Sequence, residues 1–200
     1  MDKKQAIALL HKERILESAK NLFYSQGYKE TTIDDLSKHS QYSRRTIYTY
    51  FINKEDILNH LIEKELLKLY TNIEQVIADE NDYFSCWINI WNIIAEYVRD
   101  NRMINDMIIN VNSTMLAQQK DSVTKSIIEL GKKINEIQQN YLITGQRQGK
   151  VKKDIDIKIT VYMFYSIISV LSQILLSKDN SVGCSWQQVY KQMLGMIEEK

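Results

Sequence analysis

The chain has 200 residues, with 26 Lys and Arg against 25 Asp and Glu and a formal net charge of +1. This length suits one large domain, or a small domain joined to a larger one. A nearly neutral chain does not bind nucleic acid or membranes by bulk charge, so any basic site has to be local. No Pro and only 6 Gly are present, which leaves little to break helices, and the composition predicts an all-α protein.

The residues that carry enzyme or metal chemistry are sparse. Cys86 and Cys184 are far apart in the sequence, so we expect neither a disulfide framework nor a zinc site, and a reducing cytoplasm is the expected location. No G-x-S-x-G motif, Gly-rich phosphate loop or metal-ligand spacing is present. The N-terminal segment lacks the continuous apolar stretch of a signal peptide. The sequence therefore predicts no enzyme, no metal site and no cofactor.

The first two predicted helices follow from apolar spacing and capping. Apolar residues at helical steps predict an amphipathic helix over 7–23, and Gly27 supplies its stop. Thr32 precedes Asp35 by three residues, in the manner of a capping box. A short second helix is therefore expected over 32–39.

A third short helix, 44–50, is expected after Ser43, which is a good N-cap residue. Arg44 and Arg45 then fall in its first turn, where the helix dipole disfavours basic side chains. This local conflict is relieved if DNA phosphates or guanine edges lie opposite the two arginines.

Two short helices joined by the tight connection 40–43 have the layout of a helix-turn-helix, whose second helix enters the major groove of DNA. Between Asp35 and Glu55 the chain has no acidic residue. The basic residues of this region are Lys38, Arg44, Arg45 and Lys54. Such clusters also occur on plain solvated surfaces, but the spacing, the caps and the missing acids together favour DNA binding.

Side-chain chemistry assigns roles within this motif. Either arginine can fork onto a guanine edge or hold a phosphate, whereas Tyr48 and Thr49 offer hydroxyls to a phosphate and to a base edge. Thr32 and Lys54 each begin a helix, where free backbone amides bind anions. Ile47, Tyr50 and Phe51 are expected to face inward. The predicted DNA-binding residues are Thr32, Arg44, Arg45, Thr46, Tyr48, Thr49 and Lys54.

Beyond the motif the pattern stays helical, giving about nine helices in all. We expect a DNA-binding domain over 1–53 and a larger helical domain over 54–200, with 54–80 as a linking helix. The uncharged segment 159–177 is long enough to span a bilayer, but its several hydroxyl groups favour a helix buried in a core or a subunit interface. The further helices are expected over 82–101, 103–112, 120–148, 156–178 and 185–199.

The larger domain contains an aromatic stripe, with Trp87 and Trp91 four residues apart on one helix face. Stripes of this kind are plain core in many proteins, and the alternative is the wall of a pocket for a flat or cationic hydrophobic effector. The candidate effector-binding residues are Trp87, Trp91, Tyr97, Met107, Tyr141, Tyr162 and Tyr165.

From Arg14 to Leu58 the chain resembles the DNA-binding head of the tetracycline-repressor (TetR) family of bacterial transcription regulators. The resemblance rests on RIL at 14–16, GY at 27–28, TTI at 31–33, TIY at 46–48 and KEDIL at 54–58, and continues weakly in QGKVKKDID. It implies that the body binds a small effector. It also implies that 156–178 and 185–199 form a four-helix bundle with a second subunit.

The chain departs from the family pattern at several positions. Gln41 stands where the family usually has Gly in the turn, and a positive φ there would cost Gln about 1 kcal/mol more than Gly. Ser37 and His39 replace small residues. Arg45 replaces a common Gly in the recognition helix, which makes it the first candidate for a base preference specific to this chain.

These expectations combine into one function. We expect a homodimeric, cytoplasmic transcriptional regulator, a repressor, that binds a near-palindromic double-stranded DNA operator and is released by a small hydrophobic or aromatic effector. No membrane association is expected. The alternative is a DNA-binding or scaffold protein of the same fold with no small-molecule effector.

Overall fold

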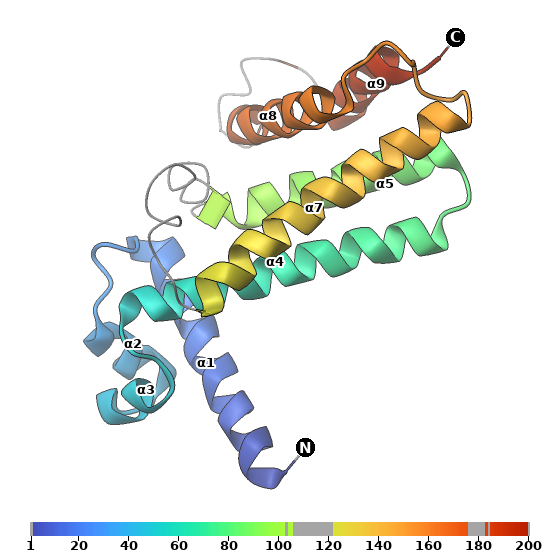
Figure 1. The fold of residues 1–200 in the computed structure, drawn as a ribbon. Helices are drawn as coiled ribbons and strands as arrows, with labels where there is room; N and C mark the ends of the chain where they lie inside the picture. The colour runs from blue at the N-terminus through green and yellow to red at the C-terminus, as the bar shows by residue number, and fades with distance from the viewer. Residues whose placement is uncertain (1, 103, 106–121, 176–182, 184, 200) are drawn as a thin grey trace. The chain divides into compact units, whose positions relative to one another are not determined.

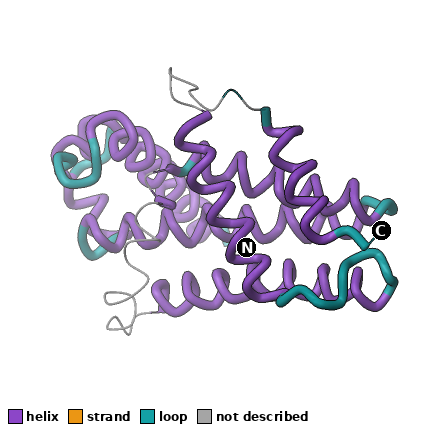
Figure 2. The backbone as a smooth tube through the Cα atoms, turned by 90° about the horizontal axis from the view of Figure 1, so that it is seen from above, coloured by secondary structure: helices purple, strands orange, loops and turns teal. Residues whose placement is uncertain are grey.

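The computed structural model describes residues 2–102, 104–105, 122–175, 183 and 185–199. In this part of the chain the protein is built from helices, without a β-strand, which confirms the all-α fold class (Figure 1; Figure 2). The predicted helix 103–112 lies mostly outside the described residues, as does Met107. The helices are α1 (Lys3–Gln26), α2 (Ile33–Ser40), α3 (Arg44–Tyr50), α4 (Lys54–Asp79), α5 (Tyr83–Asp100), α7 (Ser122–Arg147), α8 (Ile157–Leu175) and α9 (Trp186–Ile197).

The chain divides into two units, and the division falls within α4 and again within α7. Among the described residues, the first unit contains the chain up to Glu65 and residues 122–127, and the second contains the rest. The predicted DNA-binding domain, 1–53, lies inside the first unit, and its exact boundary stays a prediction.

The first unit packs α1 against α2 and α3 around an apolar core. Leu36 on α2 and Ile47 on α3 are fully buried, so the two short helices meet through their apolar faces. Lys20 on α1 and the buried Glu65 on α4 form an ion pair at 2.7 Å. The other buried apolar residues here include Ile15, Leu16, Ala19, Phe23, Phe51, Ile57, Leu58 and Leu61.

The turn between α2 and α3 is held by serine side chains. Gln41 has φ 61° and ψ 21°, a left-handed backbone conformation. Residues other than Gly or Asn are strained there by about 1 kcal/mol or more. Ser37 Oγ donates to the carbonyl of Tyr42 at 2.7 Å, and the N–H of Tyr42 donates to Ser40 Oγ at 3.3 Å. The positive φ expected at Gln41 is thus present, and the serine bonds hold the turn in spite of it.

In the second unit α5 packs against both α8 and α9. Trp87 and Trp91 of α5 each meet the ring of Phe164 on α8 edge to face, with centroids 5.4 and 5.6 Å apart. All three rings are at most 2% exposed, so they form the centre of this core. No helix in the described residues is long and apolar enough to cross a membrane.

A pair of tyrosines joins α5 to α7. The rings of Tyr83 and Tyr141 stack with centroids 4.6 Å apart, and each hydroxyl donates to the backbone carbonyl of the other residue, at 3.1 and 2.9 Å. Burial raises the pKa of both hydroxyls, so they remain protonated donors. Gly145 makes this contact possible, because a Cβ atom there would lie 2.1 Å from the Tyr83 hydroxyl oxygen.

Candidate nucleic-acid interface

Helix α3 presents one buried residue and a row of exposed ones. Ser43 caps it by accepting a hydrogen bond from the backbone N–H of Thr46 at 3.1 Å. Ile47 is fully buried, whereas Arg44, Arg45 and Thr49 are exposed. Tyr48 is 53% exposed and Thr46 is partly exposed. The structure therefore brings the predicted DNA-facing side chains of α3 to one surface.

Both ends of α3 are positioned by a histidine that the sequence did not single out. His11 Nδ1 of α1 lies 2.9 Å from the hydroxyl oxygen of Tyr50, within hydrogen-bonding distance. The same ring lies 4.9 Å from the ring of Tyr42, which directly precedes the cap of α3. Tyr50, which was expected to face inward, is partly buried, and its hydroxyl adds a polar contact with α1.

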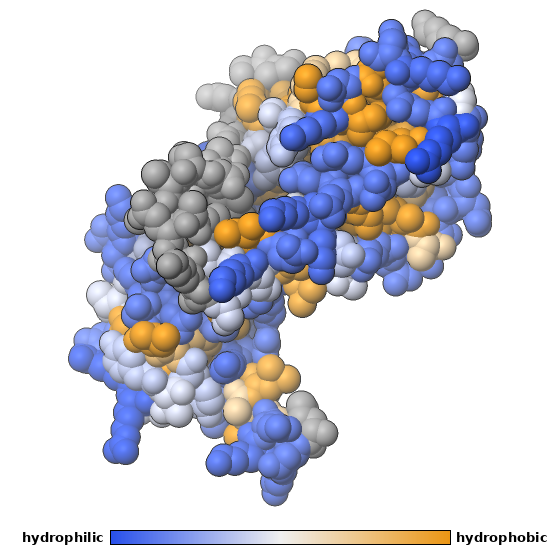
Figure 3. Space-filling model, viewed as in Figure 1, coloured by the Kyte–Doolittle hydropathy of each residue, from blue (hydrophilic) through white to orange (hydrophobic). Residues whose placement is uncertain are grey.

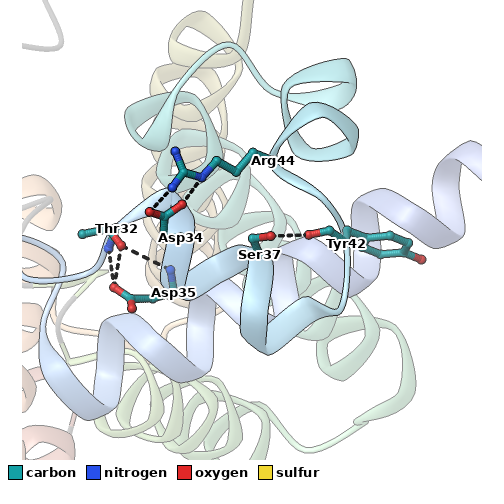
Figure 4. Close-up of polar contacts among 6 residues, drawn as sticks. All are labelled: Thr32, Asp34, Asp35, Ser37, Tyr42 and Arg44. Atoms are coloured by element: carbon teal, nitrogen blue, oxygen red, sulfur yellow. Dashed lines mark hydrogen bonds and ion pairs between the residues drawn. The ribbon is translucent and has the colours of Figure 1, made fainter.

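The two arginines at the start of α3 have different surroundings. Arg44 pairs with Asp34 of α2 through two nitrogen–oxygen contacts, Nε to Oδ1 and Nη2 to Oδ2 (Figure 4). Arg45 makes no ion pair with any other described residue. The sequence did not indicate the pairing of Arg44 with Asp34, because Asp34 precedes Arg44 by ten residues and belongs to a different helix.

Thr32 and Asp35 complete the predicted capping box at the start of α2. The Thr32 hydroxyl and N–H both donate to Asp35 Oδ2, at 2.7 and 2.9 Å, and the Asp35 N–H donates back to Thr32 Oγ1 at 3.2 Å (Figure 4). These hydrogen bonds hold the pKa of Asp35 below its usual range, so the carboxylate is charged at neutral pH. A phosphate at Thr32 would therefore have to replace existing bonds beside a negative charge.

Lys54 has a structural use that differs from the predicted phosphate contact. Its Nζ donates to the carbonyls of Tyr28, Lys29 and Thr31, at 2.8, 3.1 and 2.8 Å. An ammonium group has only three N–H donors, so none is left for a phosphate. Nζ also lies 4.5 Å from the centre of the Tyr28 ring. The side chain of Lys54 ties the start of α4 to the loop before α2.

The aromatic residues proposed for effector binding meet only in part. Trp87, Trp91 and Tyr141 line one small cavity between α5, α7 and α8. Its volume is about 10 Å³, room for roughly one water molecule. The remaining lining residues are Ile90, Gln138, Leu142 and Val161.

The other candidate effector residues lie elsewhere. Tyr97 is buried in α5 and does not line this cavity. Tyr162 is 50% exposed on the surface of α8, and Tyr165 donates a hydrogen bond from its hydroxyl to Asn105 Oδ1. In the structure as it stands, the two tryptophans are core residues.

The cavity has one polar feature. Gln138 is 5% exposed, and its Nε2 donates to the carbonyl of Ile134 at 2.8 Å. Its Oε1 is buried without a hydrogen-bond partner in the part of the chain that the structure describes. Buried acceptors of this kind are uncommon, because an unmade hydrogen bond costs about 1–3 kcal/mol.

The fold of the first unit and the exposed side chains of α3 define a helix-turn-helix DNA-binding protein. Residues 15–61 match the family described as "Bacterial regulatory proteins, tetR family". Residues 15–61 belong to this family of transcriptional regulators, as the resemblance over 14–58 predicted.

Known proteins similar to this chain are regulators of the same kind. The fatty acid metabolism regulator protein of Bacillus subtilis is 24% identical over 162 residues, 78% of each chain. The dhaKLM operon transcriptional activator DhaS of Lactococcus lactis is 25% identical over 130 residues, which span 63% of this chain and 65% of that activator.

A similar solved structure is that of the regulator FadR from Bacillus subtilis in complex with stearoyl-CoA. It superposes with a TM-score of 0.69 at 18% identity, and the match covers 92% of this chain and 96% of that one. At this level of identity the likeness establishes the fold of the chain.

Replacing Lys54 with Met keeps the aliphatic stem and removes the ammonium. We expect Lys54→Met to lower the free energy of unfolding by about 1–3 kcal/mol, because three carbonyls lose a charged donor. The slope of log affinity for DNA against log salt concentration should stay unchanged. Urea unfolding at a fixed protein concentration and binding titrations at several salt concentrations measure the two quantities.

Lys38→Met is the matched control, since Lys38 is an exposed cation on α2 whose removal should change stability by no more than about 0.5 kcal/mol. If Lys54→Met instead leaves stability unchanged and lowers the salt slope by about 1, the Lys54 ammonium contacts a phosphate.

Proposed function

We propose that the chain is a cytoplasmic transcriptional repressor that binds a near-palindromic DNA operator as a homodimer and leaves it when a small hydrophobic effector binds. The observation that supports this most directly is the exposed surface of α3, where Arg44, Arg45, Tyr48 and Thr49 stand clear of the core. Arginine and hydroxyl side chains at these positions suit contacts with both phosphates and base edges in the major groove.

The dimer surface proposed for residues 156–178 and 185–199 is supported by exposed apolar side chains. On α8 they recur at i, i+3, i+4 and i+11, a spacing that places them along one helix face. Figure 3 shows hydrophobic residues gathered over α8 and α9. These side chains are 42% to 58% exposed, and they are Ile159, Tyr162, Met163 and Val170 on α8 and Met196 on α9.

The effector site that we propose is the cavity beside Trp87 and Trp91. Ligand pockets commonly measure about 300–1,000 Å³, so a cavity of about 10 Å³ has to open before it can hold an effector. Its lining residues are mostly aromatic and aliphatic, and the Oε1 of Gln138 has no hydrogen-bond donor among the residues that the structure describes. This suits an acyl or other apolar compound that also carries an N–H or O–H group.

The direction of regulation depends on which conformation of the body has the open cavity. An effector that binds only the opened body favours the conformation that has the open cavity. It can shift the equilibrium away from the DNA-bound conformation by no more than the difference between its binding free energies for the two conformations. Release from the operator is the outcome we propose. An activator among the similar proteins shows that relatives of this chain also act in the opposite sense. A regulator of the same fold without any effector is the alternative.

Selection of bound duplexes from a random pool by the full-length protein tests the proposed function. We expect an enriched sequence with two half-sites in inverted order, one helical turn or a multiple of it apart, because a twofold dimer presents two copies of α3. Binding is then compared between the enriched and the random duplex at one salt concentration. Equal affinity for both would rule out a sequence-specific regulator.

A charge on the α8 surface should dissociate the dimer. We expect Val170→Asp to weaken dimerisation by at least about 3 kcal/mol, more than a hundredfold, because it buries an unpaired carboxylate. Sedimentation velocity over a range of concentrations measures the effect, and affinity for the two-half-site duplex should fall with it. Asn140→Asp, on an exposed part of α7, adds the same charge and should remain dimeric. A dimeric Val170→Asp protein would exclude this surface.

Replacing Gln138 with Leu removes the unpartnered acceptor and keeps a similar volume. We expect Gln138→Leu to raise the free energy of unfolding by about 1 kcal/mol and to weaken binding of an effector that uses this acceptor. The probe is stearoyl-CoA, whose pantetheine arm carries amide N–H donors. The change in tryptophan fluorescence measures the binding of stearoyl-CoA, and the release of the enriched duplex measures its effect on DNA binding.

Gln139→Leu, at the neighbouring and partly exposed position, should respond to stearoyl-CoA as the wild type does. A Gln138→Leu protein that binds and releases DNA with unchanged stearoyl-CoA dependence would place the site elsewhere. A wild type that shows no response to stearoyl-CoA would exclude the acyl class.

A further inference from the structure

Asp34 and Arg44 connect the first turns of two helices, α2 and α3. The pair is bidentate and lies at the surface, with the arginine side chain 64% exposed and the aspartate side chain 44% exposed (Figure 4). Each residue stands at a helix N-terminus, where the dipole favours Asp34 and disfavours Arg44. The ion pair therefore relieves the unfavourable placement of Arg44 before any DNA is bound.

The geometry of the pair leaves one edge of the guanidinium group available. Asp34 accepts from Nε and from one hydrogen of Nη2. Arginine has five N–H donors in a planar fork, so the two hydrogens of Nη1 and the second hydrogen of Nη2 remain. One hydrogen of Nη1 and the second hydrogen of Nη2 point away from the side chain in parallel. This pair of donors matches the O6 and N7 acceptors of guanine.

The partner charge distinguishes a base contact from a phosphate contact. A phosphate attracts a cation mainly through long-range charge, and Asp34 cancels most of the charge of Arg44 at that range. A forked contact to guanine depends instead on the orientation of the guanidinium group and on the entropy cost of fixing the arginine side chain. The ion pair with Asp34 already fixes the Arg44 side chain, so this cost is smaller when guanine is bound. Arg45, which has no ion pair among the described residues, keeps its full charge and its mobility.

We infer that Asp34 is a positioning residue that holds Arg44 for a forked contact with a guanine in each half-site. Arg44 is then the residue that specifies the base, and Arg45 contacts the phosphate backbone. This assignment reverses the roles suggested by the unusual Arg45 in the sequence. It rests on the proposed function, because it presupposes a specific operator.

The experiment compares base preference among variants of the full-length protein. Affinity is measured for the enriched duplex and for duplexes carrying each single base change, at one salt concentration. Arg44→Lys should lose preference for one guanine per half-site by roughly 5- to 150-fold, since lysine cannot make the forked contact. Arg45→Lys should leave the preference at every position intact.

Asp34→Asn is the decisive variant. We expect it to reduce preference at the same guanine as Arg44→Lys, by a smaller factor, and to raise affinity for random duplexes because a negative charge near the phosphates is gone. Asp34→Glu keeps the carboxylate and should retain more of the preference than Asn. Glu129→Gln, an exposed acid on α7, makes the same change in net charge and should alter neither quantity.

Two outcomes would overturn the inference. If Asp34→Asn raises affinity for all duplexes equally and leaves every base preference intact, Asp34 only repels DNA. If the guanine preference is lost with Arg45→Lys and kept with Arg44→Lys, the roles are the other way round. Thermal unfolding of each variant separates a loss of folding from a loss of preference. A wild type without any preference would instead contradict the proposed function.

Discussion

The ammonium of Lys54 is the contact on which the geometry of the first unit depends. By donating to the carbonyls of Tyr28, Lys29 and Thr31, it fixes the start of α4 against the segment that leads into α2. That segment ends at Thr32, whose capping box sets the first turn of α2 and so the position of Asp34. Asp34 in turn fixes Arg44 on α3. Lys54 is thus linked to the position of a DNA-facing arginine through the loop and the capping box.

Helix α3 has only seven residues, too few to be stable alone, so its placement comes from its surroundings. Ile47 buries its inner face, His11 holds Tyr50 at its end, and Asp34 holds Arg44 at its start. These three attachments come from the core and from two other helices. The outer face is therefore presented by a rigid support, which a site that has to match base edges requires.

Local signals in the sequence were enough to place most elements. Apolar periodicity and capping residues located the helices of the motif, with the capping box at Thr32 for α2 and the Ser43 cap for α3. The sequence did not indicate the pairs that join different helices, because the partners of Arg44 and Tyr50 lie 10 and 39 residues away. The structural role of Lys54 was missed for the same reason, since nothing local shows that a loop 23 residues earlier supplies carbonyls to its ammonium.

The aromatic stripe on α5 is core in this structure and also lines the proposed effector site. Trp87 and Trp91 pack against Phe164 as core, yet they also line the cavity beside the unpartnered oxygen of Gln138. An effector that enters has to displace packing in the same core that stabilises the second unit, so its binding energy is spent partly on opening. Because α4 and α7 each contribute residues to both units, they are covalent routes by which such a change can reach the DNA-binding helices. On the proposed function, an effector acts by making a state with an open cavity more favourable than this closed one.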